Sequence, residues 1–181
     1  MDSKTRATIE DLYKVEGKAE LVHGEIVKMP PAGDDPNIAG GEIFVSLRDY
    51  ARRTGRGKAY TDGVGFHVHL PHREAFGPDA AYYIGPRTGM RFLEGAPIFA
   101  VEVRSEHDYG PAAERAMQEK RDDYFACGTL VVWDVDLLSE EVVRVYRASD
   151  PHHPTIYRRG DIAEAEPAVP GWRMAVNALF A

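Results

Sequence analysis

The longest apolar runs of the chain predict the strands at the centre of a β-sheet. Residues 97–103, Pro-Ile-Phe-Ala-Val-Glu-Val, are almost continuously apolar, which is typical of a strand covered on both faces. Residues 130–135 form a second run of this kind, and residues 142–146 alternate as a half-buried strand does. Further strands are expected at 58–70 and 79–84, with short strands and turns towards the C-terminus.

Helical periodicity marks the segments between these strands. Apolar residues recur at helical spacing over 37–53. Residues 111–126 begin with Pro111 and are followed by Gly128, the residue types that helices favour at their two ends. The elements expected near the N-terminus are a short helix over 8–17 and a hairpin over 20–29, turned at His23-Gly24. This order predicts an α/β fold with a mixed central sheet flanked by helices.

Length and composition predict a single domain and exclude several classes of protein. The chain has 181 residues without a repeat or a linker, so we expect one domain over 1–181. Its single cysteine, Cys127, excludes a disulfide framework and a cysteine-rich zinc site. The polar N-terminus and the absence of a long apolar run predict a cytoplasmic protein with no membrane contact. A net charge of −7 means that a polyanion would need a local basic patch.

A carboxylate near the end of the predicted central strand carries the first functional signal. Burying an unpaired charge costs several kcal/mol or more, so Glu102 requires a cation beside it. Strand alternation places Glu102 and Arg104 on one face. The simplest alternative to a functional site is a salt bridge at the strand end.

A second carboxylate, Asp79, opens the strand predicted at 79–84. Pro78-Asp79 alone is a common turn pair and carries little weight. If the strand lies beside that of Glu102, the two carboxylates converge. Two converging carboxylates bind a hard divalent cation and repel each other without one.

A lysine interrupts the apolar seam of the helix at 111–126. Met117, Lys120 and Tyr124 follow a three-four spacing, so the ammonium of Lys120 is expected to reach Glu102. The alternative is a lysine whose stem covers apolar surface while its charge reaches water. We expect Lys120→Ala to leave the fold intact, since this change costs little helix propensity.

Several segments, in this order, resemble the bacterial Uma-two family of endonucleases. That family belongs to the restriction-endonuclease-like superfamily with the Pro-Asp, Glu-x-Lys signature, PD-(D/E)xK. The similar segments are 19–27 (AELVHGEIV), 77–80 (GPDA), 95–103 (GAPIFAVEV) with Ser105, 119–121 (EKR) with Tyr124, Ala126 and Gly128, 132–135 (VWDV), 169–171 (VPG) and 179–180 (LF).

The resemblance implies an endonuclease that hydrolyses phosphodiester bonds of DNA or RNA with Mg²⁺ or Mn²⁺. It implies metal ligands at Asp79 and Glu102, joined by the Val103 carbonyl, a third acidic residue at Glu20, and the catalytic lysine at Lys120. Glu20 would hold a second metal or anchor Lys120. The chain departs from the wider superfamily at Arg104, where a lysine is usual. Arginine cannot act as a base at neutral pH, so Arg104 is expected to contact phosphate instead.

Basic residues also cluster at the end of the helix predicted over 37–53. The residues expected to contact nucleic acid are Arg48, Arg52 and Arg53, in addition to Arg104. A solvated helix end, with cations near its negative C-terminus, is the favoured alternative for these residues.

Two other classes of function stay open at this stage. His67 and His69, with His72 and Glu74, resemble the first metal motif of cupins and would suit a transition metal, but the second motif is missing. Alternatively, the domain is a non-catalytic module that binds nucleic acid or a partner, including a homodimer, and its acidic cluster is vestigial.

Overall fold

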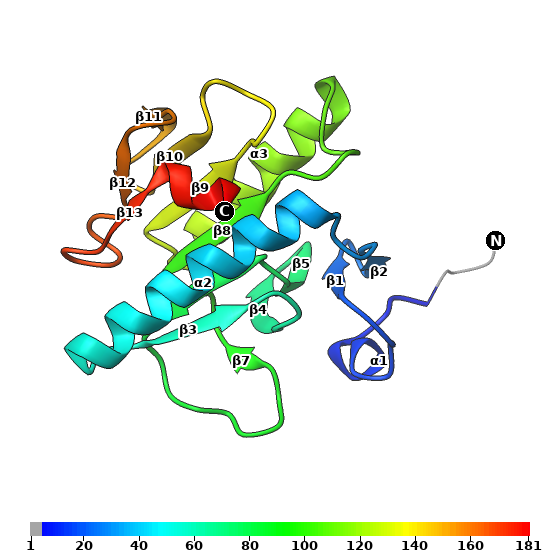
Figure 1. Ribbon diagram of the computed structural model, residues 1–181. Helices are drawn as coiled ribbons and strands as arrows, with labels where there is room; N and C mark the ends of the chain where they lie inside the picture. Colours follow the sequence, from blue (N-terminus) through cyan, green and yellow to red (C-terminus); the bar gives the residue numbers. More distant parts are fainter. Residues whose placement is uncertain (1–4) are drawn as a thin grey trace.

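A six-stranded mixed sheet forms the centre of the computed structural model, which describes residues 5–181 (Figure 1). Its strands, in spatial order, are β11 (Asp150–Tyr157), β10 (Val143–Arg147), β9 (Val131–Val135), β8 (Phe99–Val103), β6 (Ala80–Tyr83) and β3 (Lys58–Thr61). Strands β8 and β9 are parallel, and every other neighbouring pair is antiparallel. The strand expected at the centre is β8, an interior strand with Phe99 and Val101 fully buried.

A second sheet carries the N-terminal hairpin. Its strands, in spatial order, are β2 (Glu25–Lys28), β1 (Ala19–Val22), β5 (Arg73–Phe76), β4 (Phe66–Leu70) and β7 (Leu93–Glu94). The hairpin turns at His23-Gly24, where both residues have positive φ, as a two-residue hairpin requires. A separate pair, β12 (Ile162–Glu164) and β13 (Arg173–Ala175), lies near the C-terminus. The predicted mixed central sheet is confirmed, and the second sheet and this strand pair add to it.

The helices follow the predicted periodicity. They are α1 (Ile9–Leu12), α2 (Asp34–Thr54), α3 (Pro111–Ala126) and the 3₁₀ helix η1 (Val176–Phe180). Thr8 and Asp11 form a reciprocal capping box at α1, which is shorter than expected. Helix α2 begins one turn earlier than predicted, because Pro36 is tolerated in a first turn whose N–H groups have no helical partner.

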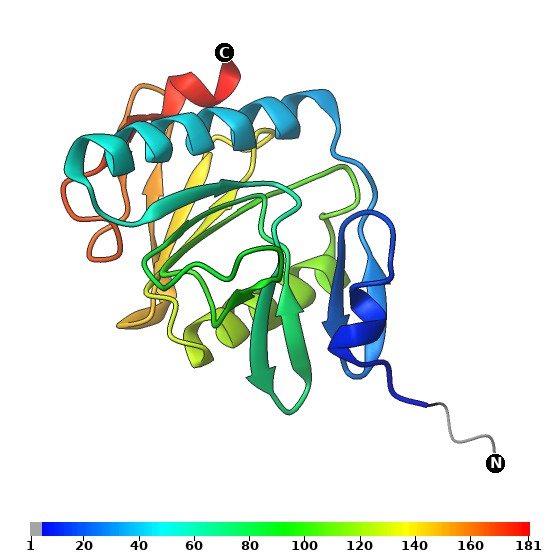
Figure 2. The same cartoon turned by 90° about the horizontal axis from the view of Figure 1, so that it is seen from below.

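The two long helices cover opposite faces of the six-stranded sheet (Figure 2). Side chains of α2 pack on the face that carries Phe99, Val101 and Trp133. Tyr124 of α3 and strands β4 and β5 pack on the other face, against Ala100. Alternation along β8 therefore directs Glu102 towards α3, as strand parity predicted. Within residues 5–181, no helix has the length and apolar character needed to cross a bilayer.

Candidate active site

A cleft of about 780 Å³ opens where the C-terminal end of β8 meets α3, the first half of α2 and the β1–β2 hairpin. Its lining includes the four side chains expected in a catalytic site, Glu20, Asp79, Glu102 and Lys120. They come from β1, the start of β6, the end of β8 and the middle of α3. Residues up to 100 positions apart in the chain, Glu20 and Lys120, therefore meet at one place.

The ammonium of Lys120 lies between the buried carboxylate of Glu20 and the partly buried carboxylate of Glu102. Its Nζ atom is 2.8 Å from Oε1 of Glu20 and 2.9 Å from Oε1 of Glu102. The hydroxyl of Tyr124, one turn further along α3, donates to the same Glu102 oxygen at 2.7 Å. The helical seam thus directs Lys120 into the site and not to solvent, and its side chain is only 13% exposed.

Glu20 is held by more contacts than its neighbours. Arg73 of β5 donates from an Nη atom to Oε2 of Glu20 at 2.8 Å, and the backbone N–H of Gly77 donates to Oε1 at 2.8 Å. Both oxygens of Glu20 are therefore bonded to the protein. This geometry suits the anchoring of Lys120, one of the two roles expected for this residue.

The carboxylate of Asp79 lies in the same cleft as Glu20 and Glu102. Its Oδ2 accepts the backbone N–H of Val103 at 2.7 Å, which fixes the start of β6 to the end of β8. Its Oδ1 is 2.8 Å from Nζ of Lys18, and Lys18 also contacts Asp62 at 2.6 Å. Sequence reasoning missed Lys18, although it precedes Glu20 by two positions and extended backbone places such residues on one face.

The pKa values of Glu20 and Glu102 are shifted in opposite directions. Burial opposes ionisation of Glu20, but the nearby charges of Lys120 and Arg73 outweigh it and lower the pKa of Glu20 to about 2. Burial raises the pKa of Glu102 to about 7 against the attraction of Lys120, and the negative charges of Asp79 and Glu20 add to the increase. Burial lowers the pKa of Lys120, but Glu102 and Glu20 overcome this and raise it above its ordinary value. The site therefore holds a permanent cation beside a carboxyl group whose proton is exchangeable near neutral pH.

Arg104 does not have the phosphate-contacting role expected for it. Its guanidinium forms two parallel hydrogen bonds to Asp134, both of 2.8 Å, and also binds Glu114 of α3. Its side chain is only 4% exposed. With its donors committed to two carboxylates, Arg104 fixes α3 to β9 and is not available to a phosphate.

The basic residues of α2 are not brought to the cleft. The lining residues of α2 end at Phe44, whereas Arg52 and Arg53 lie in its exposed last turn, roughly 12 Å further along the helix axis at 1.5 Å per residue. Arg48 lies between Phe44 and Arg52 along the helix, and its guanidinium contacts the carboxylate of the neighbouring Asp49 at 3.3 Å. Contact of Arg48, Arg52 and Arg53 with nucleic acid stays a prediction for a surface outside the cleft.

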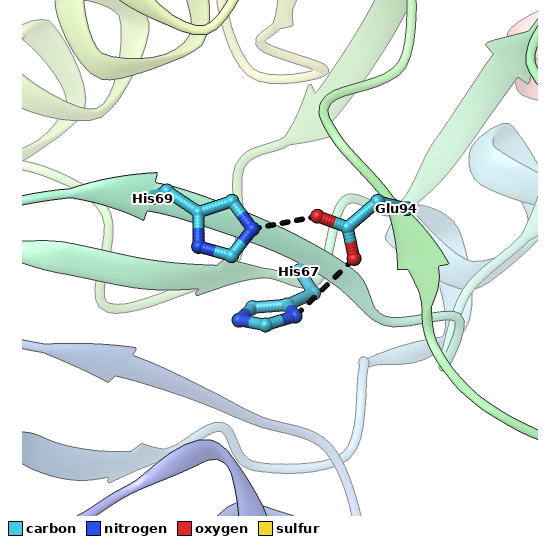
Figure 3. Close-up of side chains that lie close together, drawn as sticks. All are labelled: His67, His69 and Glu94. Carbon is cyan, nitrogen blue, oxygen red and sulfur yellow. Dashed lines mark hydrogen bonds and ion pairs between the residues drawn. The ribbon is translucent and has the colours of Figure 1, made fainter.

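The histidines that suggested a cupin motif belong to different environments. His72 binds Asp123 at 2.5 Å and stacks with His23, while His67 and His69 meet Glu94 and not the expected Glu74 (Figure 3). The helices on both faces of the central sheet also differ from a cupin barrel. The cupin-like alternative is therefore wrong.

Comparisons with known proteins agree with this architecture. A crystal structure of a putative nuclease belonging to DUF820 from Anabaena variabilis superimposes with a TM-score of 0.74, covering 96% of this chain and 97% of that one at 16% sequence identity. At this identity the likeness shows a shared fold. No curated protein matches the chain. The family model described as a putative restriction endonuclease, Uma2, matches residues 7–177. Since that match spans nearly the whole sequence, the chain belongs to the Uma2 family.

Proposed function

We propose that this protein is a Mg²⁺- or Mn²⁺-dependent endonuclease that hydrolyses phosphodiester bonds, with DNA as the expected substrate. The observation that carries this proposal is Lys120 held between Glu20 and Glu102, in the same cleft as Asp79. A cation beside carboxylates at a cleft is the arrangement that phosphoryl chemistry needs, because charge develops on oxygen during the reaction.

The chemistry of the available donors fits a hard divalent ion. Asp79 and Glu102 offer carboxylate oxygens and Val103 offers its carbonyl, and Mg²⁺ is commonly bound by one or two carboxylates together with water. A bound ion would lower the pKa of a water molecule and polarise the phosphate. Glu102 must lose its proton to act as a ligand, and its raised pKa of about 7 places this event near neutral pH.

The surrounding residues position these groups. Glu20, itself held by Arg73, keeps Lys120 at one side of Glu102, where its ammonium can orient the attacking water or neutralise charge on the phosphorane. Tyr124 fixes the Glu102 carboxylate by its hydrogen bond. Lys18 neutralises Asp79, which limits the repulsion between Asp79 and Glu102.

The test is a cleavage assay on duplex DNA, single-stranded DNA and structured RNA. Each substrate is incubated with Mg²⁺, Mn²⁺ or chelator, and the proteins are wild type, Asp79→Asn and Glu102→Gln. We expect metal-dependent cleavage that both substitutions abolish. Glu119→Gln is the matched control, because it removes one negative charge from the cleft lining without altering the bonded residues. Cleavage that persists in chelator or in both variants would contradict the mechanism, and no cleavage of any substrate would favour a non-catalytic binding module.

A further inference from the structure

Outside the cleft, we propose a transition-metal site in which His67, His69 and Glu94 are the ligands and Zn²⁺ is the bound ion. Figure 3 shows the carboxylate of Glu94 facing both imidazoles, with one oxygen directed at each. Nε2 of His69 is 2.6 Å from Oε1 of Glu94, and Nδ1 of His67 is 3.4 Å from Oε2. The ring centroids of the two histidines are 4.3 Å apart.

Backbone pairing holds the three side chains together. Along β4, Phe66 and Val68 are buried, so His67 and His69 point to the opposite face. Strand β7 pairs in parallel with β4 and places Glu94 beside His67, with Leu93 buried on the inner face. This juxtaposition joins residues 25 positions apart, and sequence alone offered Glu74 in place of Glu94.

Further hydrogen bonds fix the backbone of this group. The N–H of Gly95 donates to the carbonyl of His67 at 2.8 Å, and the hydroxyl of Tyr83 donates to the carbonyl of Glu94 at 2.8 Å. The three candidate ligands are therefore carried by paired strands and not by a loose loop. Only the side chains need to adjust when an ion binds.

The donor set selects the class of metal. Two imidazoles and one carboxylate suit Zn²⁺ and its neighbours in the transition series, whereas Mg²⁺ prefers oxygen donors alone. The three donor atoms lie within 4.8 Å of one another, and a tetrahedral Zn²⁺ with ligands at 2.0–2.2 Å needs them about 3.4 Å apart. Small side-chain rotations close that difference. The side chains of His69 and Glu94 are 67% and 57% exposed, so a fourth position is open to water.

Metal binding here would join β7 to β4 more firmly. Strand β7 has only two residues and follows the long connection 84–92 after β6. An ion shared by both strands crosslinks the end of this connection to the sheet that also carries Glu20 and Arg73. We therefore assign the site a stabilising role that does not depend on the proposed nuclease chemistry.

The experiment is Co²⁺ and Zn²⁺ titration of the full chain without an affinity tag. Co²⁺ is followed by visible absorption and Zn²⁺ by isothermal titration calorimetry. We expect one equivalent of either ion at this site, beyond any held in the cleft, and a higher Tm with Zn²⁺. His69→Gln and Glu94→Gln should each weaken binding about tenfold or more, since losing even an outer partner of a ligand costs 10–100-fold.

Two controls keep the outcomes distinct. His153→Gln removes an exposed histidine that bonds to Asp150 at 2.8 Å but belongs to no three-donor group among residues 5–181, and it should bind like wild type. Asp79→Asn and Glu102→Gln should also retain Zn²⁺ binding, which separates this site from the cleft. Absent binding, or binding unchanged in His69→Gln and Glu94→Gln, would overturn the proposal and leave the cluster as an ion pair only.

Discussion

Lys120 shares one ammonium between a buried carboxylate, Glu20, and a partly buried one, Glu102, so replacing it changes stability as well as chemistry. Removing one partner of a buried ion pair costs about 3–5 kcal/mol, because the remaining charges are left uncompensated. We predict a loss of that size for Lys120→Ala in urea unfolding with chelator present. The sequence alone predicted that Lys120→Ala abolishes cleavage and leaves the fold intact, and the two ion pairs add this loss of stability to that prediction.

Two comparisons separate the fold from the chemistry at this position. Lys14→Ala removes a lysine whose side chain is 75% exposed and should change the free energy of unfolding by less than about 0.5 kcal/mol. Lys120→Arg keeps the cation and should retain more stability than Lys120→Ala, but it alters the shape and hydration of the charge and should lower cleavage. A loss below about 1 kcal/mol in Lys120→Ala would show that the pairing does not stabilise the fold.

The pH dependence of stability reports the environment of Glu102. Its folded-state pKa, about 7, lies above the ordinary 4.5, so the native state holds this proton more tightly than the unfolded chain does between those two values. The contribution to stability is complete below pH 4.5 and is lost as the pH rises towards 7. In metal-free protein, the free energy of unfolding of wild type minus that of Glu102→Gln should fall across this window by on the order of 3 kcal/mol.

Glu20 gives the opposite sign. Its folded-state pKa is lowered to about 2, so its stabilisation is present above pH 4.5 and lost as the pH falls towards 2. The difference between wild type and Glu20→Gln should therefore shrink on acidification. If the free energy of unfolding of wild type minus that of Glu102→Gln stays constant from pH 4.5 to 7, the raised pKa of Glu102 is contradicted.

Some residues of the site could be predicted from the sequence, and others could not. Glu102 and Lys120 could be found because each places a charge where periodicity requires burial. Arg73 could not be assigned, because its contact with Glu20 depends on the pairing of β1 with β5, which brings together residues some 50 positions apart. Lys18 was missed because its partners, Asp62 and Asp79, become its neighbours only in the folded chain. Arg104 was misread since its partners, Asp134 and Glu114, become neighbours only in the folded chain.

At the scale of elements, the end of α3 sets the position of Lys120 and Tyr124. The chain leaves the helix through Gly128, whose φ of +99° is unfavourable for residues with a Cβ. We predict that Gly128→Ala lowers the free energy of unfolding by about 1–2 kcal/mol. Gly41→Ala is the matched comparison, because Gly41 lies within α2 and its added Cβ meets nothing within 4 Å.

The two glycine variants should shift stability in opposite directions. Alanine is favoured over glycine inside a helix by up to about 1 kcal/mol, so Gly41→Ala should stabilise the protein. Urea unfolding of both variants in one buffer provides the measurement. Equal and small effects would mean that backbone conformation at Gly128 does not constrain α3.

The strength of local patterns decided which elements were predictable. Helix α3 carries both an N-terminal proline and a following glycine, and β8 and β9 carry long apolar runs, so these elements were expected from sequence. Strand β5 contains Arg73 and Glu74, and β7 has only two residues, so neither has a periodic signal of its own. These two strands complete the second sheet and place Arg73 and Glu94.

At the scale of the whole molecule, a net negative charge opposes contact with nucleic acid, and the proposed metal ion would offset it locally. The net charge is −7, and this count includes the cleft carboxylates of Asp79, Glu102 and Glu20, which pair with Lys18, Lys120 and Arg73. We predict that a fluorescent DNA oligonucleotide binds at least about tenfold more tightly with Ca²⁺ than with chelator, measured by anisotropy. Ca²⁺ is chosen because it takes oxygen ligands of the same kind.

Two outcomes of this binding measurement are informative. Asp79→Asn should lose most of the increase, because it removes one of the two carboxylates proposed to hold the ion. Equal affinity with Ca²⁺ and with chelator would place binding elsewhere, for example on the exposed arginines at the end of α2.

The central claim, that Asp79 and Glu102 share one divalent ion beside Lys120, is tested most directly by locating Mn²⁺ in crystals through its anomalous scattering. We expect one strong peak between these two carboxylates and near the Val103 carbonyl, and no peak there in crystals of Glu102→Gln. A wild-type map with no peak in the cleft, while Asp79 and Glu102 keep their contacts to Lys18 and Lys120, would contradict the claim.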